Sequence, residues 1–212
     1  MYRRTVNSVR PPLLLIAAAV VSVAVAAIPL LYLVVRTSSG GWNAVVEALL
    51  RDRTLETTIT SVALVTLVIV GCLLIAVPTA WLLARTNIPG RAFFLVMAAL
   101  PLAVPSYVMA YAWIAEFPSM SGIGAAALVM VLATYPYVAI PLTAALRSID
   151  AGHEEDARSL GLGPLAVASR VTLPLAWPAA AAGVLLAALY TLSEFGTVAI
   201  FRVDGFTRVI YT

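Results

Sequence analysis

The sequence predicts an all-α fold, a polytopic bundle of membrane-spanning helices. Hydrophobic residues make up 62% of the 212 positions and charged residues only 11%, whereas soluble domains average roughly 45–50% and about 25%. The mean hydropathy is +1.01. The apolar residues gather in runs of about 20 or more, the length that a helix needs to cross roughly 30 Å of hydrocarbon.

Runs of this length predict five spans. They are approximately Leu13–Val35, Thr57–Ala84, Ala92–Ala115, Ile123–Leu146 and Leu175–Phe201. The polar segment Arg36–Glu56 is expected to be the longest external loop, with a helix beginning near Thr54. No internal repeat is evident, so residues 1–212 are expected to form a single transmembrane domain.

The first run has the flanks of a secretory signal peptide. Three arginines precede it within the first ten residues, and Ala24–Ala26 imitates a cleavage site. The run nevertheless continues to Val35, about 23 residues, which is longer than the apolar region of a typical cleaved signal. An uncleaved membrane anchor is therefore favoured.

The arginines predict the orientation of the bundle, since all thirteen basic residues are arginine. With the N-terminus in the cytoplasm, eight arginines fall inside and five outside, the bias expected of cytoplasmic loops. The inner set is Arg3, Arg4, Arg10, Arg85, Arg91, Arg147, Arg158 and Arg170, and the outer set is Arg36, Arg51, Arg53, Arg202 and Arg208. This orientation places the polar segment Arg147–Pro174 in the cytoplasm.

Two predicted spans contain pairs of prolines. Pro101 and Pro105 lie in the third, and Pro136 and Pro141 lie in the fourth. Proline removes a backbone donor and clashes with the preceding turn, so kinks are expected. Two interpretations stay open: irregular packing, or helices bent around a translocation path.

No catalytic or cofactor chemistry is visible in the sequence. The single cysteine, Cys72, lies in an apolar run and is interpreted as a small buried hydrophobic residue. His153 is the only histidine and cannot assemble a metal site alone. The arginines are scattered singly and form no patch for nucleic acid. We therefore expect no metal, no cofactor and no nucleic-acid partner.

The segment Arg147–Pro174 is a polar island of about 28 residues in an otherwise apolar chain. Residues 149–160 suit a short helix whose acidic residues lie in its N-terminal part, where the helix dipole favours them. The glycines at 161 and 163 and the following proline are expected to end it. A second short helix, Leu165–Arg170, then leads back to the bilayer.

The predicted helix offers an apolar tip beside charges. Ala157, Leu160 and Leu165 form the tip, and Glu155 and Arg158 flank it. A short helix of this kind fits a groove on another protein. On composition alone, a solvated loop helix without a partner is the alternative.

The spacing in the island favours the partner. It reads E-x-A-x3-G-x9-V-x-L-P from Glu155 to Pro174 and resembles the cytoplasmic loop signature of ABC importer permeases. Asp156 stands where that signature usually has its first alanine. The resemblance implies that residues 147–174 dock on an ABC ATPase subunit. The implied docking residues are Glu155, Asp156, Ala157, Arg158, Leu160, Gly161, Val171, Leu173 and Pro174.

Further stretches resemble the permeases of iron(III) ABC importers, namely Ala80–Arg91, Pro101–Tyr111, Tyr135–Tyr137 and Leu192–Ile200. The resemblance implies a type I ABC importer permease in the bacterial inner membrane. ATP hydrolysis is then expected on a separate subunit, so this chain itself is not an enzyme. Expected partners are the ATPase, a periplasmic or lipoprotein substrate-binding protein, a second permease half or protomer, and membrane lipid.

Permeases of that branch are typically long chains with two fused halves. This sequence resembles the first half and stops before the sixth helix expected there. It is therefore expected to be a fragment, a clipped reading frame or one piece of a split permease. One half lacks the second docking loop and the opposing pore wall, so it is not expected to transport alone.

An acidic residue in the outer half of the fifth predicted span suggests a functional role, because such residues are costly unless they face water or a partner. One interpretation is that Glu194 lines a path for iron together with Tyr107 and Tyr111. The alternative is an interfacial glutamate with the tyrosines in an aromatic belt.

The functional hypotheses are ranked by how much of the sequence each explains. An importer permease comes first, with iron(III) ahead of thiamine, polyamine or another small solute as substrate. A membrane scaffold or sensor, whose loop binds some other soluble protein, comes second. A membrane-embedded enzyme comes last, because few polar groups cluster at one depth.

Overall fold

The computed structural model describes residues 13–39 and 52–205, and these are helical apart from short connections. The chain divides into two compact units, Met1–Leu55 and Glu56–Thr212. The first unit contains α1 (Leu13–Ser39), which includes the first predicted span. The arginines before α1 and most of the predicted loop Arg36–Glu56 lie outside the described residues.

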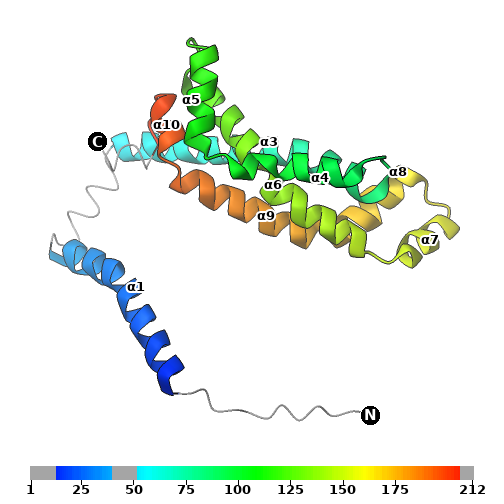
Figure 1. The fold of residues 1–212 in the computed structure, drawn as a ribbon, viewed down its shortest axis with the longest axis horizontal. Helices are drawn as coiled ribbons and strands as arrows, with labels where there is room; N and C mark the ends of the chain where they lie inside the picture. The colour runs from blue at the N-terminus through cyan, green and yellow to red at the C-terminus, as the bar shows by residue number, and fades with distance from the viewer. Residues whose placement is uncertain (1–12, 40–51, 206–212) are drawn as a thin grey trace. The chain divides into compact units, whose positions relative to one another are not determined.

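The second unit contains the helix bundle. Figure 1 shows α3, α6 and α9 side by side, with α7 and α8 at one end and α5 and α10 at the other. The segments are α3 (Asp52–Arg85), α4 (Arg91–Ala99), η1 (Leu100–Ala103), α5 (Ser106–Glu116), α6 (Gly122–Ser148), α7 (Ala151–Ser159), α8 (Pro164–Val167), the π turn η2 (Ala168–Thr172), α9 (Leu173–Ser193) and α10 (Gly196–Ile200).

Three helical segments of the described residues are long and apolar enough to cross a membrane. They are Thr54–Arg85, Gly122–Ser148 and Pro164–Ser193, and α4, η1 and α5 together make a fourth if that bent segment counts as one span. The side chains of α1 are described without a gap from Ile16 to Tyr32, and this stretch is apolar. The predicted all-α membrane bundle is confirmed, and among the described residues of the second unit three of the predicted spans are straight helices and one is bent.

The third predicted span is broken. A bend of 90° separates Arg91–Ala103 from Ser106–Glu116, so the span predicted over Ala92–Ala115 is made of two helical parts, and the kink expected at Pro101 and Pro105 is confirmed. Val104 is extended, with φ −108° and ψ 121°, because the residue before a proline is disfavoured in the helical region. The carbonyl of Pro105 then accepts the first hydrogen bonds of α5.

The prolines of α6 have a different outcome, since this helix continues from Gly122 to Ser148 through both Pro136 and Pro141. Of the two predicted proline pairs, only Pro101/Pro105 therefore coincides with a break in the chain's helical path.

The fifth predicted span also needs correction at both ends. The helix ends at Ser193 rather than Phe201, and Glu194 is extended before the short α10. At the other end α8, η2 and α9 form one continuous helix from Pro164. Pro174 does not interrupt it, because the π turn just before it adjusts the hydrogen bonds that a proline inside a helix would break. Leu173 N–H instead bonds to the Ala168 carbonyl across the π turn.

The core lies around α6. In the 18-residue apolar stretch of α6, 61% of the residues are buried, against 28% in the corresponding stretch of each of the other two long spans. Cys72 is buried against it as predicted, with Sγ 3.3 Å from Thr134 Oγ1. The buried residues of α3 recur every three or four positions, which defines one face: Thr57, Ser61, Leu64, Val68, Cys72, Ala76, Ala80 and Leu83.

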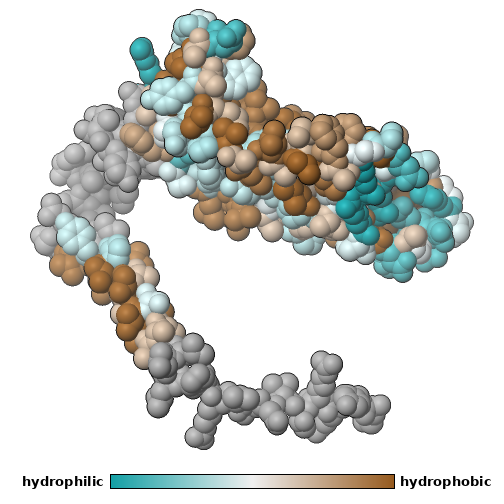
Figure 2. Space-filling model, in the orientation of Figure 1, coloured by the Kyte–Doolittle hydropathy of each residue, from teal (hydrophilic) through white to brown (hydrophobic). Residues whose placement is uncertain are grey.

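The face of α9 that meets α6 consists of small residues: Ala176, Ala180, Gly183, Ala187 and Thr191. A Cβ at Gly183 would lie 2.3 Å from the Tyr137 carbonyl oxygen and 2.7 Å from the Val138 Cα. Small residues let membrane helices approach backbone to backbone. The outward side chains are mostly apolar, and Figure 2 shows hydrophobic surface along the flank of the bundle.

We expect Gly183→Ala to destabilise the bundle by about 1–3 kcal/mol or more, because the added methyl meets fixed backbone atoms. Thermal unfolding in detergent measures this effect. Gly124→Ala in α6 is the matched control, since its Cβ would meet open space. Equal melting temperatures for the two variants would contradict the packing assignment.

Candidate functional site

The helix α7 stands at one end of the bundle and is capped locally. Asp150 precedes it, and its carboxylate accepts a hydrogen bond from Gly152 N–H at 3.1 Å, as at a typical helix N-terminus. Ile149 is extended and follows α6. The predicted helix Ile149–Leu160 is therefore present, but it covers Ala151–Ser159.

The C-terminal end of α7 is a glycine turn. Gly161 has φ +86°, Leu162 N–H donates to the Ala157 carbonyl at 3.2 Å, and Gly161 N–H donates to the Arg158 carbonyl at 2.9 Å. This pair of bonds is the Schellman motif, which requires a left-handed residue at Gly161. The expected role of Gly161 as the turn is confirmed, and Pro164 begins α8 rather than merely ending α7.

The turn leaves two leucines in the open. Leu160 is 83% exposed and Leu165 is 87% exposed, and the charged side chains of Glu155, Asp156 and Arg158 are exposed beside them. Figure 2 shows hydrophilic surface gathered over this end of the molecule. The result is a small apolar tip beside charged side chains, at the end of the bundle where α7 and α8 lie.

Ala157 is not part of that tip, and the prediction that it would be was wrong. It is 6% exposed, because it lies three residues after Glu154 on the face of α7 that is turned inward.

The remaining residues of the implied docking set lie elsewhere. Leu173 and Pro174 line a cavity of about 380 Å³, whose other lining residues are Val77, Leu142, Ser169, Trp177 and Ala180. Val171 is partly buried in η2. The structure thus separates these residues from the exposed tip and places them where the chain joins the long helix α9.

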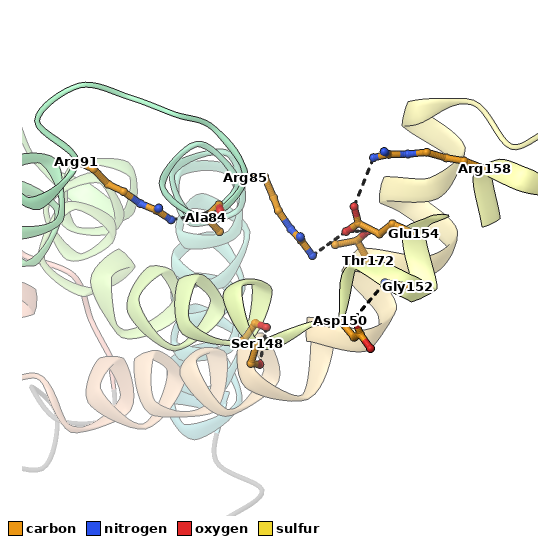
Figure 3. Close-up of polar contacts among 10 residues, drawn as sticks. Ala84, Arg85, Arg91, Ser148, Asp150, Gly152, Glu154, Arg158 and Thr172 are labelled. Atoms are coloured by element: carbon orange, nitrogen blue, oxygen red, sulfur yellow. Dashed lines mark hydrogen bonds and ion pairs between the residues drawn. The ribbon is translucent and has the colours of Figure 1, made fainter. Parts of the chain in front are cut away.

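Glu154 is the residue that sequence reasoning missed. As Figure 3 shows, its carboxylate lies between Arg85 and Arg158. Oε1 is 2.7 Å from Arg85 Nη2 and accepts a hydrogen bond from Thr172 Oγ1 at 3.0 Å. Oε2 is 3.5 Å from Arg158 Nη2. The spacing of Glu154 and Arg158 was a local signal for one of these contacts, whereas Arg85 is distant in sequence.

The end of α3 is held by two other arginines. Arg91 Nη2 donates to the Ala84 carbonyl at 3.2 Å (Figure 3). Arg147 Nη2 donates to the Leu83 carbonyl, also at 3.2 Å. The last carbonyls of a helix lack intrahelical partners and carry partial negative charge. Two of the arginines that the sequence analysis assigned to membrane topology therefore also supply hydrogen-bond donors to the last carbonyls of α3.

At the opposite end of the bundle, Glu194 lies between α9 and α10. Its Oε1 accepts a hydrogen bond from Thr197 N–H at 3.0 Å. A Cβ at the neighbouring Gly196 would lie 3.3 Å from that oxygen and 2.7 Å from the Tyr107 Cβ. The structure thus brings Glu194 and Tyr107 to one place, with Tyr111 exposed one turn further along α5.

The described residues contain no cluster of three or more His, Cys, Asp or Glu side chains that could hold a metal ion.

Comparison with known proteins now adds the family. A family model described as "Binding-protein-dependent transport system inner membrane component" matches residues 76–206, which include α7 and its glycine turn. The Fe(3+)-transport system permease protein FbpB 2 of Haemophilus influenzae is 32% identical over 184 residues, covering 87% of this chain and 36% of the relative.

Two other relatives transport different solutes by name. The molybdenum transport system permease protein ModB of Escherichia coli is 31% identical over 62% of this chain and 65% of its own length. The sulfate transport system permease protein CysW of Synechocystis is 31% identical over 57% of this chain and 49% of its own length. The chain thus spans between about a third and two thirds of these permeases.

The match over residues 76–206 and the bundle of apolar helices that carries it lead to one conclusion: the chain belongs to the family of binding-protein-dependent transport system inner membrane components.

Proposed function

We propose that this chain is the membrane-spanning permease component of an ATP-driven importer and that residues 147–174 are its docking segment for a separate ATPase subunit. The observation that carries the proposal is the exposed apolar tip of Leu160 and Leu165. Leaving two leucines in water forgoes the free energy of burying them, about 1.5–3 kcal/mol for each. A groove on a partner protein recovers that free energy.

The geometry supports a helix-in-groove contact. The left-handed turn at Gly161 fixes the path between Leu160 and Leu165. Glu155, Asp156 and Arg158 offer charges at the rim of the contact, where they act on orientation and association rate. Ala157 packs inward and serves the docking set through the shape of α7. Val171, Leu173 and Pro174 serve it by joining the segment to α9.

The assembly that follows from this proposal has several members. Solute arrives on a periplasmic or lipoprotein substrate-binding protein, as the family description implies. A second permease half or protomer supplies the opposing pore wall, since this chain covers only 36% of its iron-permease relative. The arginine bias supports a cytoplasmic N-terminus and a cytoplasmic docking segment.

Iron(III) is the proposed solute. The similarity to the iron permease extends over 87% of the chain, against 62% for the molybdenum permease. A carboxylate beside two tyrosines also suits a cation better than an oxyanion, and we propose Glu194, Tyr107 and Tyr111 as part of the path. Molybdate and sulfate are the competing solutes, through the relatives that carry those names.

We expect Leu160→Ala to weaken capture of the ATPase roughly tenfold, because truncating a buried anchor typically costs more than about 1 kcal/mol. Glu155→Ala is expected to weaken it as well. Co-purification of the ATPase with the tagged full complex measures the effect. Leu185→Ala, an exposed leucine on α9, is the control, and equal capture by all variants would refute docking through α7.

A second substitution tests the turn itself. Gly161→Val should uncouple solute uptake from ATP hydrolysis while the protein still inserts, because a left-handed β-branched residue costs about 1–2 kcal/mol or more. Its Cβ would meet no neighbour within 4 Å, so the effect is conformational. Stimulation of ATPase activity in the reconstituted complex is the measurement, and coupling at the level of the unsubstituted protein would contradict the proposal.

Glu194→Gln tests the solute path. Loss of the charge should reduce iron uptake into proteoliposomes by roughly tenfold, equivalent to about 1.4 kcal/mol of cation binding. Molybdate and sulfate are measured in parallel. Unchanged iron uptake would assign Glu194 to the cap of α10 alone, and uptake of an oxyanion instead would replace iron as the solute.

A further inference from the structure

The carboxylate of Glu154 contacts three different parts of the chain. It pairs with Arg85 at the end of α3, with Arg158 on α7 itself, and with the hydroxyl of Thr172 in η2. Thr172 is completely buried, and η2 leads directly into α9. One side chain of α7 is therefore bound to the ends of two long helices of the bundle.

The three contacts are not equivalent. The side chains of Arg85 and Glu154 are only 21% and 14% exposed and approach to 2.7 Å, whereas Arg158 is 60% exposed and lies 3.5 Å away. Exposed ion pairs contribute little, but removing one member of a shielded pair leaves the other unpaired away from water. Of the three contacts of Glu154, those with Arg85 and Thr172 therefore contribute most to holding α7.

The backbone alone does not hold α7 in this position. It is joined to α6 by the extended residues Ile149 and Asp150 and to α8 by the turn at Gly161–Gly163. Both connections are short, but neither continues a helix. Besides the inward packing of Ala157, the side-chain contacts of Glu154 connect α7 to the ends of α3 and α9.

We propose that Glu154 is a positioning residue that makes α7 move as one body with the ends of α3 and α9. A displacement of the docking helix is then passed to the spans through Arg85 and Thr172 rather than being absorbed by the loop. This inference rests on the proposed function for the source of the displacement. The link itself is a property of this chain and can be measured without an ATPase.

The experiment measures the distance between spin labels on α7 and just beyond α3. Cysteines are introduced at Leu160 and Asn87, both exposed, in a Cys72→Ala background, and the full chain is placed in lipid nanodiscs. With Glu154 unchanged, the two labels should show a single narrow distance distribution. In Glu154→Gln the distribution should become broad. The matched control is Glu155→Gln, the same substitution one residue away on the exposed face, which should keep the narrow distance.

A double-substitution cycle isolates the ion pair. Arg85→Gln should broaden the distance as Glu154→Gln does, and the two together should broaden it no further, because they remove the same contact. Arg158→Gln should have little effect. A narrow distance in Glu154→Gln, or broadening that is fully additive with Arg85→Gln, would overturn the proposal.

The full complex distinguishes this inference from docking itself. Glu154→Gln should still capture the ATPase but hydrolyse at least about fivefold more ATP for each solute transported, the scale of a typical coupling between sites. Leu160→Ala should instead lose capture. If Glu154→Gln lost capture as well, its role would be structural support of the tip and the inference would fail. Normal capture of the ATPase by Leu160→Ala would contradict the proposed function but would not affect the conclusion from the spin-label distances.

Discussion

The direct contact between the backbones of α6 and α9 is the constraint on which the bundle depends. Hydrophobic burial offers little to hold helices together in lipid, where the surroundings are as apolar as the side chains, so close packing must do it. At Gly183 the two main chains leave no room for a methyl group. The alanines before and after it, Ala180 and Ala187, are buried on the same face. With α9 fixed in this way, α6 becomes the centre against which α3 packs through its own small residues.

Charge is used sparingly in this bundle and is concentrated at the ends of helices. Arg91 and Arg147 supply donors to carbonyls that the end of α3 leaves unpaired, and Glu194 supplies an acceptor to the first turn of α10. Unsatisfied backbone groups are expensive near a membrane. Because charged residues are few, one carboxylate, that of Glu154, pairs with several partners. These contacts explain how a polar segment can be attached firmly to an apolar bundle.

Local features of the sequence predicted local structure well. Acidic residues followed by Gly161 predicted α7 to within two residues at its start, because capping and glycine turns depend on neighbours in the chain. Hydropathy could not predict where the last span ends, since the residues after Glu194 are as apolar as those before it. It also could not distinguish the proline pair at which the chain bends from the pair that α6 accommodates.

The parts of the site that sequence reasoning missed depend on tertiary contact. Arg85 and Glu154 are far apart in the chain, and nothing in either neighbourhood indicates that they meet. The inward direction of Ala157 follows from the same arrangement, because the face of α7 that carries Glu154 is turned to the bundle. The exposed tip, by contrast, was mostly predictable, since Leu160 and Leu165 flank a turn that the glycines predict.

The continuous helix from Pro164 to Ser193 has a mechanical consequence. Thirty residues at 1.5 Å each make a rod of about 45 Å. If such a rod tilts by about 5° around its α8 end, the region of Tyr190 is displaced by roughly 3–4 Å. The hydrogen bond from Tyr190 to Ser106 is 2.8 Å long and cannot span that additional separation. A small rotation at the α8 end of the rod would therefore break the hydrogen bond that joins α9 to α5 at the other end.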